Sequence, residues 1–138
     1  MKKYILYAAT VVVVIGTVIG YNVLTPSPEI KIQDATTDLV INATKLYGDF
    51  SLDEGTANQD YVGKVLEVKG MLKNVEKKAD NEIQLVLDAE DDLGAITCNL
   101  QVIESLAIEE LKIGDPITVK GVCTGYLFDV VLDHSMVL

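Results

Sequence analysis

Beyond Tyr61 the apolar residues of this chain fall on every second position, and this spacing constrains the fold more than any other feature. Alternation of apolar and polar side chains is typical of strands with one buried face. Five such segments follow one another, at residues 62–76, 83–87, 96–100, 117–123 and 130–138. A helical pattern over residues 102–111 separates the third segment from the fourth, and Gly70 breaks the first, where a bent strand needs no side chain. Three strands, one helix and two strands is the order of the OB-fold, a five-stranded Greek-key barrel.

A helical spacing precedes the first strand. Apolar residues recur there at intervals of three and four, which predicts one helix from near Asp34 to Phe50 with Thr36 or Thr37 as its N-cap. The apolar members of this pattern are Leu39, Ala43, Leu46, Tyr47 and Phe50. A second, short helical turn is expected over residues 53–59.

The first 24 residues predict a membrane segment. Lys2 and Lys3 precede an uncharged apolar run over residues 4–21, which reaches the lower limit for a bilayer-spanning helix, and residues 22–24 add another turn. The run is longer than the apolar part of a cleavable signal peptide, so we favour an uncleaved anchor over a cleaved signal, which stays open as the alternative. Because the lysines come first, the N-terminus is expected in the cytoplasm and the rest of the chain outside it.

The chain accordingly divides into an anchor over residues 1–24, a linker over 25–34 and one domain over 35–138. Pro26 and Pro28 disfavour helix in the residues before them, which is why we expect a linker there. Within the anchor, Gly16 and Gly20 have the spacing that lets two membrane helices approach closely. A homodimer through these glycines stays open beside the alternative that they are incidental.

Charge argues against several classes of partner. The chain has a formal charge of −10, with 21 acidic residues, 11 lysines and no arginine, and every acidic residue follows residue 24. Nucleic-acid binding draws on phosphate neutralisation by lysine and arginine, and arginine makes the commonest base contact. Nucleic acid is therefore not expected as a partner, and an anionic membrane surface would repel the domain. Cationic proteins, metal ions and uncharged ligands remain.

Cys98 and Cys123 are the only cysteines. In an oxidising compartment such a pair suggests one disulfide. Both residues also lie in apolar strand patterns, where a free buried cysteine is an ordinary core residue, so the sequence leaves both alternatives open. Their spacing resembles no zinc site, and the single histidine cannot complete one.

Four segments also resemble one family. They are residues 61–70 (YVGKVLEVKG), 96–98 (ITC), 111–115 (LKIGD) and, most specifically, 119–126 (VKGVCTGY). Together they look like the tRNA_anti-like family of small bacterial OB-fold proteins, which often carry an N-terminal membrane or lipoprotein segment. The resemblance covers about residues 35–138. It implies the fold and no activity. The location that we expect, at the bacterial inner membrane with the domain outside the cytoplasm, follows from the N-terminal segment.

The exposed face of the second and third strands is where OB-folds usually bind ligands. In this chain that face is expected to be polar, with no aromatic ring to stack on a base and no cation to follow a phosphate backbone. Its members are Glu82, Gln84, Val86, Asp88, Thr97, Asn99 and Gln101. We take Gln84, Thr97 and Asn99 as the candidate contacts for a peptide or small ligand.

The turn between the fourth and fifth strands, residues 125–129, carries Tyr126, Leu127 and Phe128. Exposed apolar side chains at such a tip are typical anchors for a partner protein. The alternative is that Tyr126 and Phe128 fold over the barrel mouth or against the preceding helix, because a small barrel has few aromatic residues to fill it. The sequence favours this second interpretation and keeps the three residues as a candidate site.

Two features allow a metal site, and each has a structural alternative. Asp88, Glu90 and Asp92 precede Gly94 in an acidic turn, whose spacing misses the EF-hand pattern and suits a solvated hairpin. His134 lies near the end of the last strand, with nothing adjacent in sequence to tune it as a ligand. An exported, anchored OB barrel is also the architecture of the periplasmic haem chaperone of cytochrome c maturation. Haem or metal handling is therefore the alternative function, although we expect no cofactor.

No catalytic set emerges from the sequence. His134 has no evident serine or cysteine partner, and there is no glycine-rich phosphate loop or metal-hydrolase motif. We therefore expect a non-enzymatic, membrane-tethered OB module outside the cytoplasm, which binds a protein, a peptide or a small ligand.

Overall fold

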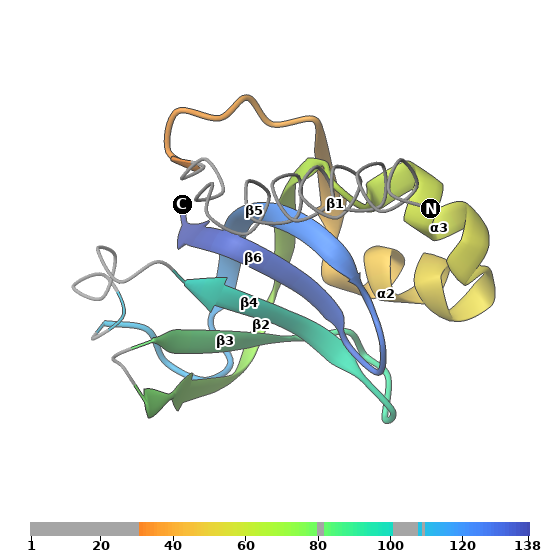
Figure 1. Ribbon diagram of the computed structural model, residues 1–138. Helices are drawn as coiled ribbons and strands as arrows, with labels where there is room; N and C mark the ends of the chain where they lie inside the picture. Colours follow the sequence, from red (N-terminus) through yellow and green to blue (C-terminus); the bar gives the residue numbers. More distant parts are fainter. Residues whose placement is uncertain (1–30, 80–81, 101–107, 109) are drawn as a thin grey trace, which may run out of the picture.

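The computed structural model describes residues 31–79, 82–100, 108 and 110–138 (Figure 1). Two short helices and six strands make up this part of the chain. They are β1 (Leu39–Asn42), α2 (Ala43–Leu52), α3 (Glu54–Tyr61), β2 (Val65–Lys77), β3 (Ile83–Asp88), β4 (Ala95–Leu100), β5 (Pro116–Tyr126) and β6 (Val130–Val137). The helix expected over residues 102–111 falls almost entirely outside the described residues.

Strands β2 to β6 close into the predicted barrel. The neighbours run β2, β3, β4, β6 and β5, and β5 pairs back onto β2 to complete the ring. All these pairs are antiparallel except β4 with β6, which is parallel. Strand β2 pairs with β5 through Val65–Met71 and with β3 through Leu72–Lys77, so a single long strand serves both sides of the closure. The five strands predicted from the alternating pattern, and the OB-like barrel, are confirmed.

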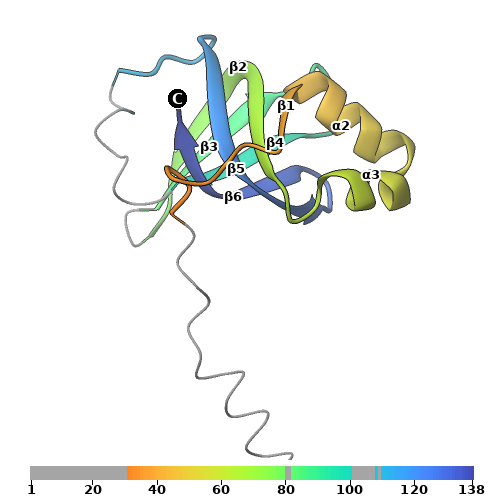
Figure 2. The same ribbon diagram turned by 90° about the horizontal axis from the view of Figure 1, so that it is seen from above.

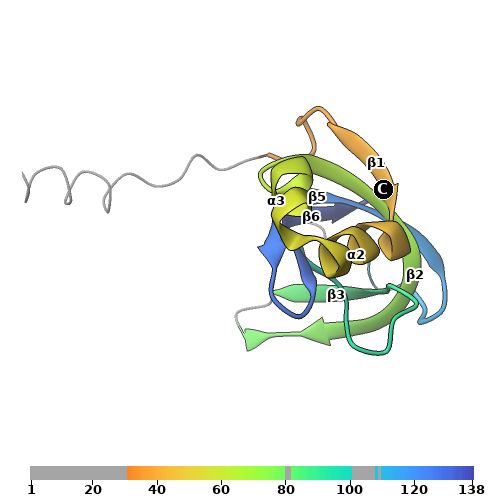
Figure 3. The same ribbon diagram turned by 90° about the vertical axis from the view of Figure 1, so that its right-hand side faces the viewer.

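The barrel interior holds the alternating apolar residues, and helix α2 covers one of its ends (Figure 3). The helix inserts Leu46 and Phe50, both at most 1% exposed, toward the strands. A Cβ on Gly70 would lie 2.9 Å from the Cβ of Ala43, so the glycine that interrupts β2 lets the first turn of α2 approach the sheet. Gly70 thus lies where an added side chain would collide with Ala43.

The N-terminal helix is shorter than the sequence predicts, because residues 39–42 form strand β1 instead. Strand β1 pairs in parallel with the first half of β2, with Leu39 opposite Leu66 and Ile41 opposite Val68 (Figure 2). Helix α2 then begins at Ala43 with Asn42 as its N-cap, so neither Thr36 nor Thr37 caps it. The apolar Leu-Val-Ile run suits a strand, and the free side of β2 supplies its partner. The second helix is confirmed as α3.

A strap before β1, residues 31–38, packs against the outside of the barrel. Ile32 is only 1% exposed, although it lies in the stretch expected to be a linker. The Nζ of Lys120 donates a hydrogen bond to the carbonyl oxygen of Ala35 over 2.5 Å, and the hydroxyl of Thr37 donates to Glu67. These contacts tie the strap to β5 and β2.

No helix in the described part of the chain is long and apolar enough to cross a membrane. The expected anchor over residues 4–24, with Gly16 and Gly20, lies outside the described residues.

The disulfide between Cys98 and Cys123 is not formed. Both cysteines are free and fully buried. Cys98 pairs with Leu132 from one side of β6 and Cys123 pairs with the same Leu132 from the other side. The two cysteines are therefore two strand spacings apart, about 10 Å between Cα atoms, where a disulfide needs less than about 7 Å. The alternative of two free core thiols is confirmed.

Candidate functional site

The outer face of β3, β4 and β6 carries a ladder of side-chain hydrogen bonds. The Nε2 of Gln84 donates to the Oδ1 of Asn99 over 2.8 Å, and the Nδ2 of Asn99 donates to the Oδ1 of Asp133 over 2.6 Å. The two amides that the sequence proposes as ligand contacts do lie together on one face. They are already hydrogen-bonded to one another, and the carboxylate of Asp133 accepts the last hydrogen bond of the row. Asp133 was not among the residues expected from the sequence.

Thr97 has a different role from its neighbours on this face. It is 8% exposed, and its hydroxyl donates to the Oδ2 of Asp129 over 3.0 Å. The Oδ1 of the same carboxylate accepts the backbone N–H of Ala95 over 2.9 Å. Asp129 therefore fastens the turn between β5 and β6 to the start of β4, and Thr97 supports that turn.

A lysine from the neighbouring strand β2 reaches the outer face of β3. Lys73 of β2 places its Nζ 3.6 Å from the Oδ1 of Asp88 in β3. The two side chains are 48% and 39% exposed, so we ascribe little stability to the pair. The expectation of a face without cations was thus incomplete, because it considered only the second and third strands of the barrel.

The aromatic turn divides into one packed residue and two exposed ones. The ring centroid of Tyr126 lies 5.6 Å from that of Phe50 in a stacked arrangement and 5.9 Å from that of Tyr47, edge to face. Tyr126 thus packs against helix α2, as the structural interpretation of the sequence predicts. Leu127 and Phe128 do not follow it, and their side chains are 80% and 77% exposed.

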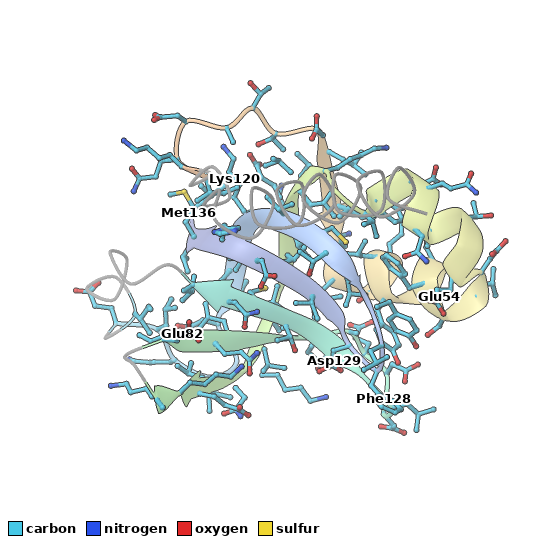
Figure 4. All side chains as sticks on the ribbon, in the orientation of Figure 1. Glu54, Glu82, Lys120, Phe128, Asp129 and Met136 are labelled. Carbon is cyan, nitrogen blue, oxygen red and sulfur yellow. The ribbon has the colours of Figure 1, made fainter. Side chains whose placement is uncertain are left out.

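A third exposed apolar residue lies in the adjoining loop. Leu93, between β3 and β4, is 86% exposed. Its neighbour Gly94 lies against Phe128, since a Cβ there would be 2.5 Å from the Phe128 carbonyl oxygen. The two loops therefore meet at one end of the barrel, where Figure 4 labels Phe128 and Asp129. We call Leu93, Leu127 and Phe128 the apolar tip.

The apolar tip rests on an ordered base. The N–H of Leu127 donates to the carbonyl oxygen of Asp129 over 3.2 Å, which closes the turn. A Cβ on Gly94 would also collide with the ring of Tyr47, whose pKa is raised by burial. The tip is thus built on α2, β4 and β5 together.

Three carboxylates directly precede Leu93 of the apolar tip in the loop before β4. Glu90, Asp91 and Asp92 are all exposed there. The Oδ1 of Asp91 accepts the N–H of Leu93 over 2.8 Å, and the Oδ1 of Asp88 accepts the N–H of Glu90 over 3.1 Å. These bonds shape the loop, which agrees with the interpretation of a solvated acidic hairpin.

No metal-binding cluster forms among the residues that the structure describes. They contain no group of three or more histidine, cysteine, aspartate or glutamate side chains arranged to hold an ion. Of the candidates, Asp88 pairs with Lys73, whereas His134 lies in β6 with a left-handed φ of 51°. His134 sits where the register of β4 and β6 shifts, and it is exposed. The haem- or metal-handling alternative thus gains no ligand set from these residues.

The comparison with known proteins settles the family. The tRNA_anti-like family matches residues 1–137 of this chain. The chain belongs to the tRNA_anti-like family. No curated protein matches it.

Solved structures show what fold this tRNA_anti-like protein shares. A "putative nucleic acid-binding lipoprotein" from Klebsiella pneumoniae superposes with a TM-score of 0.60 at 18% identity, over 83% of this chain and 99% of that one. The asparaginyl-tRNA synthetase of Entamoeba histolytica gives a TM-score of 0.42 at 16% identity, over 55% of this chain and 21% of that one. At such identities the Klebsiella likeness establishes a common fold.

The tRNA_anti-like resemblance seen in the sequence is therefore confirmed, but it does not locate a site. Leu93 and Asp129 are the members of the tip region that sequence reasoning missed. A leucine inside an acidic turn, directly before a glycine, was the available signal for Leu93. Nothing in the sequence signalled that its loop meets the turn between β5 and β6, since that follows from barrel closure.

Proposed function

We propose that this tRNA_anti-like protein is a non-enzymatic binding module, tethered to a membrane and exposed outside the cytoplasm, which docks a partner protein on the apolar tip. The observation that carries the proposal is the joint exposure of Leu93, Leu127 and Phe128 on an ordered base. Large apolar side chains exposed together commonly mark interaction sites, whereas single ones need no explanation. An aromatic anchor among them is typical of the residues that dominate binding energy.

The carboxylates next to Leu93 favour a cationic partner. Glu90, Asp91 and Asp92 precede Leu93, and the whole chain has a formal charge of −10. Opposite charges around an apolar anchor speed association and discriminate against wrong partners. The proposed partner is accordingly a protein segment in which lysine or arginine residues flank an apolar side chain.

The tether is proposed from the first 24 residues. The apolar run over residues 4–21, preceded by two lysines, supports a membrane segment with the barrel outside the cytoplasm. The Klebsiella neighbour is named a lipoprotein, which supports membrane association for this fold. Protease protection in membrane vesicles tests the proposed orientation, because an external barrel is digested from the outer side only.

Nucleic acid is the competing ligand, since the same neighbour is named for binding it. Against it stand the absence of arginine and the 21 acidic residues of this chain. The outward residues of β3 and β4 also offer no ring for stacking. A gel-shift at low salt is the decisive test, because phosphate-driven binding is strongest there. A shift by single-stranded RNA or DNA would overturn this part of the proposal.

The docking proposal is tested by capture from the native membrane. The full-length protein, cross-linked in its membrane and purified, is compared with the double variant Leu127→Ser/Phe128→Ser. A defined partner is expected with the wild type and at least about tenfold less of it with the variant, which corresponds to about 1.4 kcal/mol. Ile113→Ser is the matched control, because Ile113 is 69% exposed and lies outside the tip.

Both variants replace exposed side chains, so their unfolding midpoints in urea are expected to stay close to that of the wild type. Equal recovery from wild type and the tip variant would remove the tip as the docking site. Loss of the partner with Ile113→Ser as well would show that the capture depends on surface apolarity in general. Tyr126 stays unchanged in this experiment, because it packs on Tyr47 and Phe50.

A further inference from the structure

Strand β1 is an open edge of the sheet. It pairs with β2 and with no other strand in the described part of the chain, on the side of β2 that faces away from β5 (Figure 2). A strand paired on one side leaves the N–H and C=O groups of alternate residues unpaired on the other. Its side chains do not block that edge, since Leu39 and Val40 are apolar and 39% and 52% exposed. Extended polypeptides recognise such edges by adding a strand.

A groove lies beside β1. It has a volume of about 370 Å³ and is open to solvent. Its lining combines the whole of β1 with one residue from each of α2, α3 and β2. The lining residues are Leu39, Val40, Ile41, Asn42, Lys45, Tyr61 and Lys69. The groove is thus lined by every residue of a strand that pairs on one side only.

The charged residues that line the groove are opposite in sign to the net charge of the chain. Both charged residues in its lining are lysines, Lys45 and Lys69, in a chain with 21 acidic residues. The Nζ of Lys45 donates to the Oδ2 of Asp49 over 2.6 Å, and the hydroxyl of Tyr61 donates to the same oxygen over 2.5 Å, which fixes one wall. Lys69 is exposed and makes no ion pair with a described residue, so its ammonium is available to a ligand.

We propose that the groove beside β1 is a second docking site, which binds an extended polypeptide segment of a partner through strand addition and pairs a carboxylate of that segment with Lys69. Four residues of β1 span about 13 Å, so a segment of about four to six residues fills the edge. A second copy of this chain fits less well. Two-fold pairing would place each groove against itself and bring its lysines near those of the partner.

The probe is a fluorescein-labelled hexapeptide of alternating valine and threonine with one central glutamate. Its binding to the full-length chain in detergent micelles is followed by fluorescence anisotropy. Saturable binding is expected, and Lys69→Glu should weaken it at least about tenfold, because reversal of the charge turns attraction into repulsion. Lys77→Glu is the matched control, since Lys77 is an exposed lysine of the same strand outside the groove. That variant should bind like the wild type.

Hydrogen exchange provides the second readout. Peptide binding should slow exchange of amides within residues 39–42, because the added strand pairs with the free edge. Val40→Lys should remove both the protection and the anisotropy change, as a lysine on an edge discourages pairing. Urea unfolding of each variant shows that it is folded.

Three results would overturn this proposal. They are the absence of saturable binding, an equal loss with Lys69→Glu and Lys77→Glu, and binding without protection of residues 39–42. Protection that rises with protein concentration in the absence of peptide would assign the edge to a second copy instead. The apolar tip lies on other elements, so the Leu127→Ser/Phe128→Ser variant should bind the hexapeptide normally. Failure of either proposal therefore leaves the other intact.

Discussion

The ring of Tyr126 stacks on that of Phe50 with centroids 5.6 Å apart and planes inclined by 21°. This contact joins the end of β5 to helix α2 and separates the packed part of the aromatic turn from its exposed part. Phe50 also lies 5.8 Å from Tyr61, so the stack reaches α3 as well. The base of the apolar tip is therefore part of the hydrophobic core.

Tyr126→Ala is expected to destabilise the protein by about 2 to 3 kcal/mol. The value lies below the usual cost of truncating a fully buried aromatic residue, since Tyr126 is half-buried. Tyr126→Phe keeps the ring contacts with Phe50 and Tyr47, so it should cost clearly less than Tyr126→Ala. Urea unfolding measures both. If Tyr126→Ala unfolds at the same urea concentration as the wild type, the stack does not support the tip.

Two glycines near each other in the fold are expected to respond in opposite directions to alanine. A Cβ on Gly94 would meet the Tyr47 ring and lie 2.5 Å from the carbonyl oxygen of Phe128, whereas a Cβ on Gly48 meets nothing within 4 Å. Gly94→Ala should therefore cost about 1 to 3 kcal/mol, as overpacking does. Gly48→Ala, inside helix α2, should stabilise by about 0.5 to 1 kcal/mol.

Thermal unfolding of the two alanine variants gives the comparison directly. Opposite shifts of Tm would establish that the loop between β3 and β4 lies directly on helix α2. A neutral Gly94→Ala would mean that the loop can move away without loss, and that the base of the tip is not fixed.

The barrel strands were predictable because apolar and polar residues alternate along them, as in strands with one buried face. Leu85 and Leu87 are fully buried while Gln84 and Val86 between and beside them are not. Strand β1 was not predictable in the same way. Its Leu-Val-Ile run fits the intervals of three and four that continue into α2. These residues form a strand because β2 has a free side with which they pair. Pairing across the chain is a tertiary effect that no local spacing contains.

The candidate site was predictable only in part, for a related reason. The sequence singled out Leu127 and Phe128, but it could not separate them from Tyr126, because all three are apolar neighbours in one turn. The strand ends at Tyr126, after Gly125 with a φ of 145°, and the next residues project outward. Leu93 joins them through loop contacts across the barrel. The groove beside β1 was missed entirely, since β1 itself was expected to be helical.

The carboxylate of Asp49 makes stability depend on pH. A hydrogen bond from Lys45 and a second from Tyr61 hold its pKa below the ordinary value of 3.8. Since the pKa is lower in the folded state than in the unfolded one, the ionised group stabilises the fold fully above about pH 4. This stabilisation is lost as the pH falls through the folded-state pKa.

Asp49→Asn should therefore be less stable than the wild type at pH 7, and the difference should shrink as the pH falls from 4 to 2. Urea midpoints measured across this range provide the test. Asp92→Asn is the control, because Asp92 is exposed and makes no hydrogen bond or ion pair in the described part of the chain. A difference between Asp49→Asn and wild type that stays constant with pH would contradict this account.

Both cysteines are expected to remain reduced thiols even in an oxidising solution. Burial raises the pKa of Cys123 to about 11 and that of Cys98 further, so neither forms the reactive thiolate at neutral pH. The register places β6 between them, out of reach of a disulfide. A thiol reagent should modify both residues in urea and neither in the native state, and a reductant should leave Tm unchanged. The protein purified without reductant is analysed by mass spectrometry. A disulfide between Cys98 and Cys123 would show that β6 does not separate β4 from β5, contrary to the register.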